Sequence, residues 1–188
     1  MPKKSQALDD SAIVKLVTAG DKEKFALLIE RYESKLLRYA QFLVNDYDSA
    51  LDIVQESFIK AYINLNSFNK SKSFSPWIYR ITHNQAINAI KKNKKTISFS
   101  SLDKNEDSFQ FDYKLDEQID KIFLQKEVLS CLKKLSFKYR EVITLFYFEH
   151  LSYEQISEIL HIPKSTVGVR ISRAKSMLKK LCNNVKDR

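Results

Sequence analysis

Apolar residues recur at steps of three and four along most of this chain, and that spacing restricts its fold more than any other feature. The longest stripe consists of Phe, Leu, Ile and Tyr at positions 25, 28, 29, 32, 36, 39 and 43. Such a stripe is typical of an amphipathic helix with one buried face. Only 2 Gly and 3 Pro interrupt the 188 residues, and strands have no obvious place. The sequence therefore predicts an all-α protein.

Residues 151 to 181 have the pattern of a helix-turn-helix. Ser152 and Gln155 have the spacing of a capping box, which predicts a helix over residues 153 to 160. A break at residues 161 to 163 separates it from a second helix that begins at Lys164. The buried stripe of this second helix is expected to be Val167, Ile171, Ala174, Leu178 and Leu181.

The opposite face of the second helix carries small polar groups and long cations, and no carboxylate. Its residues include Ser165, Val169, Ser172, Arg173 and Ser176, flanked by Thr166 and Arg170. Such a face suits phosphates and base edges in a DNA major groove. The alternative is an ordinary helical hairpin with a solvated basic face, which the absence of acids over two turns disfavours.

The net charge of +9 is unevenly distributed. Residues 1 to 95 hold 16 Lys and Arg against 10 Asp and Glu, residues 96 to 120 hold 2 against 7, and residues 121 to 188 hold 14 against 6. Two basic ends flank an acidic middle, so a polyanion could bind both ends with salt-dependent affinity. The alternative is a soluble basic protein with no such ligand.

The cysteines and histidines predict no metal site and no cofactor. Cys131 and Cys182 each fit an apolar helical register, and the three His are isolated from one another. We expect both cysteines to be reduced core thiols. No stretch approaches the ~20 apolar residues of a membrane span, and residues 1 to 10 lack the apolar core of a signal peptide. A cytoplasmic protein without membrane insertion is expected.

A helix that Asp46 or Asp48 can cap is expected to have two faces. Its core face is followed around the helix by a second face of Asp52, Gln55, Glu56, Ile59 and Ile63. A mixed acidic and aliphatic face is unusual for plain solvent exposure, so it predicts a docking face for a partner helix. The alternative is a surface helix with two stray isoleucines.

The loop that follows combines aromatic and basic residues. Residues 66 to 75 have turn composition, and Ser75 and Pro76 are expected to be the N-cap and first residue of the next helix. Aromatic and basic side chains interleave here: Tyr62, Phe68, Phe74, Trp77 and Tyr79 with Lys70, Lys72 and Arg80. This is the composition of a platform for stacked, unpaired bases. The alternative is that aromatic residues at helical spacing belong to the core.

The order of these parts resembles a bacterial RNA polymerase sigma factor of the small, two-domain extracytoplasmic-function type. The matching blocks are DIVQESFIKAY at 52–62, the loop and helix start from Ser67 to Asn84, Leu135 with YREV at 139–142, and LSYEQI at 151–156 continuing to Thr166 and Val167. They cover nearly the whole chain in the family's order.

The resemblance implies two helical domains and a noncatalytic role. Residues 1–95 would dock on the polymerase clamp and melt the minus-ten element, and residues 117–188 would bind the minus-thirty-five element. The acidic, flexible linker at 96–116 would join them. The expected partners are core RNA polymerase, promoter DNA and an anti-sigma factor, with the chain a monomer within the holoenzyme.

The resemblance also assigns site residues. The polymerase contacts would be Asp52, Gln55, Glu56 and Ile59. The minus-ten contacts would be Phe68, Lys70, Lys72, Phe74, Trp77, Arg80 and Asn84. The minus-thirty-five contacts would be Lys164, Ser165, Thr166, Gly168, Val169, Arg170 and Arg173.

Five positions depart from the family's pattern, and one of them is minor: Ser165 stands where the family usually has Gly before Thr166. His161 stands at the turn where the family usually has Gly, and Lys70 stands where a loop glycine is expected. Gly168 and Val169 occupy the two principal base-reading positions, which are commonly a basic residue and Ser. Promoter specificity therefore cannot be carried over from the family.

Two other classes of function compete with this interpretation. An autonomous helix-turn-helix regulator would normally dimerise to meet symmetric half-sites, and the two-ended charge and the docking face disfavour it. A nucleic-acid enzyme could use Asp48, Asp52 and Glu56 as helix-spaced Mg²⁺ ligands. However, Asp52 and Glu56 flank aliphatic residues on an exposed face.

Overall fold

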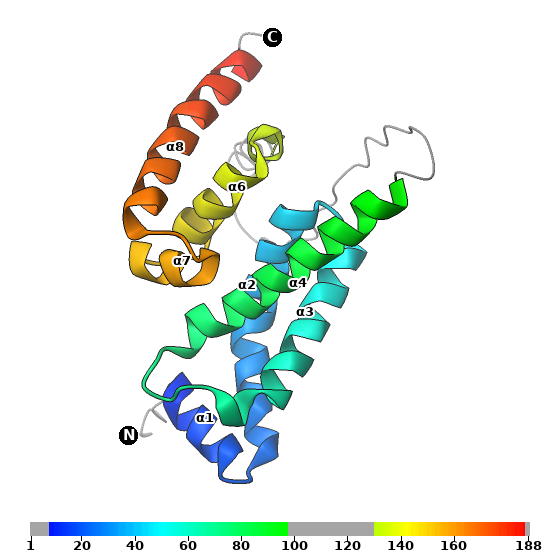
Figure 1. The fold of residues 1–188 in the computed structure, drawn as a ribbon, viewed down its shortest axis with the longest axis vertical. Helices are drawn as coiled ribbons and strands as arrows, with labels where there is room; N and C mark the ends of the chain where they lie inside the picture. The colour runs from blue at the N-terminus through cyan, green and yellow to red at the C-terminus, as the bar shows by residue number, and fades with distance from the viewer. Residues whose placement is uncertain (1–7, 98–129, 187–188) are drawn as a thin grey trace, which may run out of the picture.

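The computed structural model describes residues 8–97 and 130–186, which contain helices and no strand. The N-terminal half consists of α1 (Asp10–Thr18), α2 (Phe25–Val44), α3 (Tyr47–Ile63) and α4 (Phe74–Ile97), with the short helices η1 (Lys22–Lys24) and η2 (Leu65–Ser67). The C-terminal half contains α6 (Phe137–Ile143), the π-helical segment η3 (Thr144–Phe148), α7 (Tyr153–Leu160) and α8 (Lys164–Lys186) (Figure 1). The all-α prediction is confirmed.

Local capping sets where several helices begin. Asp9 accepts a hydrogen bond from the amide of Ala12 at 2.7 Å, and Asp46 accepts one from the amide of Ser49 at 2.8 Å. Each satisfies an amide that has no partner inside its helix. The predicted capping box of Ser152 and Gln155 is present at the start of α7. Helix α7 begins at Tyr153 and helix α8 begins at Lys164, as the sequence predicted.

Helix α4 begins two residues earlier than predicted. The sequence placed the N-cap at Ser75, but the helix starts at Phe74. Phe74 is only 2% exposed and belongs to the core, so its burial holds the first turn in place and overrides the preference of Pro76 for the first helical position.

The turn of the helix-turn-helix uses a left-handed residue. His161 ends α7 with φ 51° and ψ 44°, a conformation in which glycine carries no steric penalty. His161 thus replaces the family's usual glycine in the same left-handed turn. The cost is backbone strain at a residue that is not glycine.

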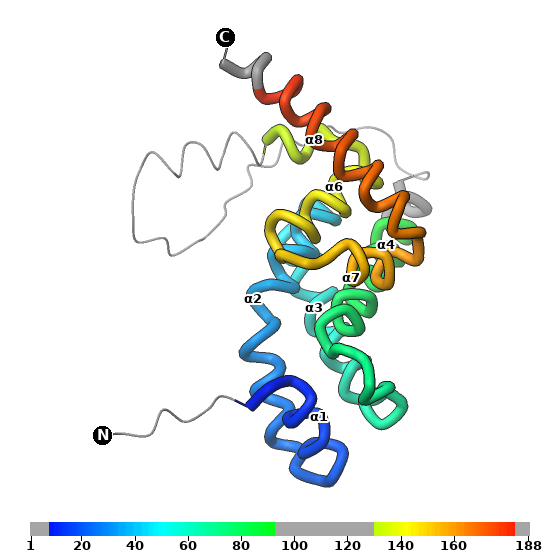
Figure 2. Tube along the Cα trace, turned by 90° about the vertical axis from the view of Figure 1, so that its left-hand side faces the viewer, coloured from blue at the N-terminus to red at the C-terminus, as the bar shows by residue number. Residues whose placement is uncertain are grey.

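The two halves pack against each other. Helix α7 packs on α4 and α6 packs on α2 (Figure 2). Apolar residues of the C-terminal half, among them Val142, Leu145 and Ile156, belong to the same buried cluster as the core of α2, α3 and α4. The larger of the two buried clusters in the described residues therefore spans both halves.

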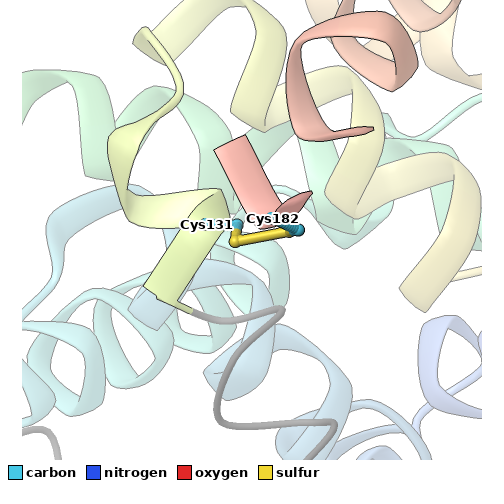
Figure 3. Close-up of a disulfide and its surroundings, with 2 residues drawn as sticks. All are labelled: Cys131 and Cys182. Carbon is cyan, nitrogen blue, oxygen red and sulfur yellow. A yellow bond between two sulfur atoms is a disulfide. The ribbon is translucent and has the colours of Figure 1, made fainter. Parts of the chain in front are cut away.

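Cys131 and Cys182 form a disulfide (Figure 3). Their Cα atoms are 5.8 Å apart although 51 positions separate them in the sequence, and such a Cα separation is normal for a disulfide. The expectation of reduced thiols is therefore wrong. Residues 130–134 form a helical turn, and Leu132 packs in one apolar cluster with Leu178 and Leu181 near the end of α8. This packing brings the two sulfur atoms together.

The predicted linker falls largely outside the described residues, since 98–116 are not among them and 96–97 end α4. Within the described ranges, no helix has both the length and the apolar character that crossing a membrane requires. No group of three or more metal-ligating side chains occurs within those same ranges.

Candidate polymerase and nucleic-acid interfaces

Helix α3 presents the predicted second face to solvent. Ile59 and Ile63 are 56% and 69% exposed, and Asp52, Gln55 and Glu56 are exposed beside them. Two large aliphatic side chains held in water are costly unless something covers them. The exposure of these five side chains is as the sequence predicted.

The aromatic residues near the start of α4 belong mainly to the core. Phe68 and Phe74 are 8% and 2% exposed, and their ring centroids lie 4.8 Å and 5.6 Å from that of the half-buried Trp77. Phe68 and Phe74 are therefore core residues in this structure, which is the alternative that the sequence left open. Trp77 alone among the three keeps a partly accessible ring.

A cleft of about 400 Å³ lies between this loop and the N-terminus of α1. Lys70 and Lys72 both line it, and both have partners. Lys70 Nζ donates to Thr18 Oγ1 of α1 at 2.9 Å. Lys72 Nζ lies 3.8 Å from a carboxylate oxygen of Glu158 in α7. Of the other predicted minus-ten residues, Arg80 is half-buried and Asn84 is exposed.

The outward face of α8 is as predicted. Ser165, Ser172 and Arg173 are exposed, and Val169 is 49% exposed. The described part of α8 contains no carboxylate. The helix combines polar, cationic and apolar groups that a major groove can contact.

Three other residues of the predicted minus-thirty-five set have contacts or close neighbours within the protein, although Lys164 itself is exposed. Lys164 pairs with Glu154 of α7, and Arg170 donates to Glu141 at 2.8 Å. A Cβ atom on Gly168 would lie 3.4 Å from the ring of Tyr153. That distance is an ordinary van der Waals contact, so the packing of α8 on α7 does not itself require glycine at position 168.

A buried carboxylate connects the two halves. Glu149 follows η3, and its side chain is 0% exposed. It accepts hydrogen bonds from Arg38 Nε at 2.8 Å, from Arg38 Nη2 at 2.9 Å and from the Tyr79 hydroxyl at 2.6 Å. The sequence analysis missed these three residues. The one available signal was an acid directly after an apolar and aromatic run.

Glu141 and His83 lie at the same contact. Burial raises the pKa of Glu141 to about 7, although Arg170 opposes that shift. Burial lowers the pKa of His83 to about 4, with a smaller contribution from the charge of His161. The 3.9 Å contact between His83 Nε2 and Glu141 is therefore not an ion pair at neutral pH, because His83 is uncharged there.

Comparisons with known proteins match both halves. Residues 28–96 match the family model described as Sigma-70 region 2, and residues 125–178 match Sigma-70, region 4. The ECF RNA polymerase sigma factor SigW of Bacillus subtilis (strain 168) is 32% identical over 174 residues, which covers 89% of this chain and 93% of that protein. The chain belongs to the sigma-70 family. The ECF RNA polymerase sigma-E factor of Escherichia coli (strain K12) is 34% identical over 181 residues, 93% of this chain and 94% of that protein.

Solved structures agree with the fold of this sigma factor. CnrH in complex with the cytosolic domain of CnrY gives a TM-score of 0.69 at 22% identity, covering 93% of this chain and 97% of that one. The sigma factor RpoE in complex with the anti-sigma factor NepR from Bartonella quintana gives 0.70 at 24% identity, covering 86% and 98%. As a sigma factor, the chain binds core RNA polymerase and directs promoter-specific transcription initiation; an autonomous regulator is not favoured.

Proposed function

We propose that residues 1–95 dock on core RNA polymerase and melt the minus-ten element, and that residues 117–188 bind the minus-thirty-five element. The linker at 96–116 joins the two modules. The chain acts in the cytoplasm as a monomer within the holoenzyme and has no catalytic activity of its own. The observation that carries the proposal is the exposed acidic and aliphatic face of α3, which has the chemistry of an unoccupied protein interface.

The docking face consists of Asp52, Gln55, Glu56 and Ile59. Ile59 supplies apolar area, and the exposed carboxylates of Asp52 and Glu56 can steer a basic partner and fix its register. Glu56 also accepts a hydrogen bond from Gln85 Nε2 at 3.2 Å, which ties the face to α4. We infer that a helix of the polymerase clamp covers this face.

The minus-ten contacts are Lys70, Lys72, Trp77, Arg80 and Asn84, and Phe68 and Phe74 act through the position of Trp77. Support comes from the cleft beside Lys70 and Lys72 and from the partly accessible ring of Trp77, on which a base can stack. Phe68 and Phe74 support the ring of Trp77 from the core side. Lys72 must leave Glu158 before it can bind a phosphate.

The minus-thirty-five contacts come from the start of α8: Lys164, Ser165, Thr166, Gly168, Val169, Arg170 and Arg173. Val169 offers an apolar surface to a thymine methyl group, and Arg173 offers hydrogen bonds to guanine or phosphate. Gly168 offers no side chain, so the backbone of α8 can approach the DNA closely there, and Arg170 reaches DNA only if it releases Glu141.

An anti-sigma factor is the further partner that we propose. The solved structure of RpoE, whose fold this chain shares, contains the anti-sigma factor NepR. Such a partner would prevent holoenzyme assembly if it covered the α3 face.

The assignment of the α3 face is tested by charge reversal. The double variant Asp52→Lys with Glu56→Lys is expected to lose binding to purified core polymerase, because reversed charge at a desolvated contact costs several kcal/mol. The matched control is Glu30→Lys with Glu33→Lys, which reverses two exposed charges on α2. Core affinity that is unchanged in the first variant, or lost equally in both, would contradict the assignment.

A further inference from the structure

Lys164 and Glu154 form an ion pair that joins the starts of the two helices of the helix-turn-helix. Glu154 is in the first turn of α7, and Lys164 is the first residue of α8. The Nζ atom of Lys164 donates to Oε1 of Glu154. This hydrogen bond lowers the pKa of Glu154 to about 2, so the carboxylate is charged at neutral pH. The side chains of Lys164 and Glu154 are 61% and 60% exposed, so the pair is accessible to a partner.

The contribution of this pair to folding is small. A cation at the N-terminus of a helix opposes the helix dipole, and the first turn of α8 contains no acid of its own to offset Lys164. An exposed ion pair adds little stability, because solvent screens the attraction and both side chains lose conformational freedom. Lys164 is thus poorly placed to stabilise the chain and well placed to contact a partner outside it.

The pair lies where a helix-turn-helix meets DNA. In this motif the N-terminal residues of the second helix contact base edges in the major groove, while the first helix crosses the sugar-phosphate backbone. Lys164 is accordingly on the base side of the pair, and Glu154 is on the phosphate side. Ser165, the next residue of α8, is exposed as well, which leaves the start of this helix accessible to a duplex.

The two central reading positions of α8 supply no hydrogen-bond donor from a side chain. Gly168 has no side chain, and the side chain of Val169 ends in methyl groups. Val169 can contact a thymine methyl group, but it cannot donate a hydrogen bond to guanine. Hydrogen-bond reading by α8 therefore depends on residues on either side of these positions, and Lys164 is a long donor on the N-terminal side.

The Glu154 carboxylate changes what Lys164 can bind. An ammonium group has three N–H donors. Glu154 accepts one of them, and the two that remain match the O6 and N7 acceptors on the major-groove edge of guanine. The carboxylate also restrains the flexible four-carbon stem of the lysine. Because a carboxylate repels a phosphate, the paired lysine is attracted to the DNA backbone less than a free lysine would be.

We propose that Glu154 is a positioning residue for promoter recognition, which directs Lys164 to a guanine of the minus-thirty-five element and away from the phosphates. This inference rests on the proposed binding of that element by α8. Glu154 thereby lowers the affinity for duplexes of any sequence and raises the selectivity for one that contains guanine at this position. Loss of Glu154 has two separate consequences: binding to unrelated DNA becomes stronger, and the preference for guanine becomes weaker.

The first test measures sequence preference in the holoenzyme. Core polymerase with the full-length chain is incubated with a promoter that it transcribes from genomic DNA, in which the minus-thirty-five element has been randomised, and the bound fragments are sequenced. Wild type is expected to select guanine at one position. Lys164→Ala should lose this preference about tenfold, and Glu154→Ala should weaken it severalfold.

The matched control for this test is Glu158→Ala. Glu158 is an exposed carboxylate on the same helix, one turn further on, and its partner Lys72 lies outside the helix-turn-helix. The control therefore removes the same charge from α7 without touching Lys164. Its preference for guanine should equal that of wild type, and circular dichroism checks that every variant is folded.

The second test measures how salt weakens the binding of the full-length chain to a short duplex of scrambled sequence. Each phosphate contact by a cation adds about 0.9 to the slope of log affinity against log salt concentration. Glu154→Ala frees Lys164 for a phosphate, so its slope should be steeper than that of wild type by about this amount. The control is the double variant Glu154→Ala with Lys164→Ala, whose slope should not exceed that of wild type.

The outcomes separate this inference from the proposed function. A guanine preference that is unchanged in Glu154→Ala, or weakened equally in Glu158→Ala, would overturn the role of Glu154, and so would a salt slope that equals that of wild type. If the wild-type holoenzyme selected no sequence at the randomised element, the proposed minus-thirty-five function would be wrong. The salt slopes would then still decide whether Glu154 holds Lys164 away from phosphates.

Discussion

At the scale of single residues, Glu141 and His83 face each other at the contact between the two halves, and burial moves their pKa values in opposite directions. The pKa of Glu141 is raised to about 7 and that of His83 is lowered to about 4. Arg170 and His83 are the charged or titratable groups facing Glu141, and the Tyr39 hydroxyl lies 2.9 Å from His83 Nδ1. Both groups therefore favour the neutral form over much of the range between pH 4 and 7.

The two residues should make opposite contributions to the pH dependence of stability. A raised carboxyl pKa gives stability that is present below the ordinary value of 4.5 and is lost as pH rises through about 7. A lowered His pKa gives stability that is present above 6.5 and is lost as pH falls through about 4. Between pH 4.5 and 6.5 the two slopes oppose each other.

Separating the two residues should reveal each slope. We predict that Glu141→Gln loses stability on acidification from pH 6.5 toward 4, and that His83→Asn loses stability as pH rises from 4.5 toward 7. The measurement is the free energy of unfolding in urea, followed by circular dichroism across this pH range. Parallel pH profiles for both variants would show that these two groups do not titrate as their burial implies.

At the scale of elements, the sequence predicted helices where local chemistry sets their limits. The capping box of Ser152 and Gln155, the N-cap Asp46 and the stripe of α2 involve residues within a few turns of each other, so their spacing is visible in the sequence. Phe74 shows the limit of this reasoning. Its burial against distant rings, and not the Ser75-Pro76 signal, decides where α4 begins.

The disulfide lay beyond such reasoning for a related reason. Cys131 and Cys182 each lie in an apolar register, but a register does not say which other helix the residue meets. Their pairing depends on residues 130–134 packing against the far end of α8, and no local signal reports that contact. The bond closes a loop with a sequence separation of 51 and anchors the C-terminal half of the proposed recognition helix.

Reduction of this bond should therefore weaken the C-terminal half. The chain-entropy model gives up to about 4 kcal/mol for a loop of this length, so dithiothreitol should lower the urea midpoint of the wild-type chain. A Cys131→Ser and Cys182→Ser double variant should unfold at the reduced midpoint whether or not dithiothreitol is present. Identical midpoints for oxidised and reduced wild type would mean that the bond adds no stability.

At the scale of the whole molecule, the sequence predicted two helical domains but not their closure. Arg38 and Tyr79 donate hydrogen bonds to an acid 111 and 70 positions away, and periodicity carries no information over such separations. Of the proposed sites, the α3 face could be predicted from the sequence, because its aliphatic residues fall outside the apolar stripe that forms the core. The minus-ten loop was harder to predict, because the sequence does not distinguish aromatic residues that are buried in the core from those that stack on bases.

The same scale connects charge with function. Basic halves on either side of an acidic middle suit a chain that holds DNA at two separated points. The central claim is that this sigma factor uses the α3 face and the start of α8 to place polymerase at promoters of its own.

Transcription in vitro tests that claim most directly. Purified core polymerase is incubated with genomic DNA fragments, with and without the chain, and the 5′ ends of the transcripts are sequenced. The chain is expected to produce new 5′ ends that share a pair of upstream elements near minus ten and minus thirty-five, and Asp52→Lys with Glu56→Lys should abolish them. If the 5′ ends with the chain match those of core polymerase alone, the account is contradicted.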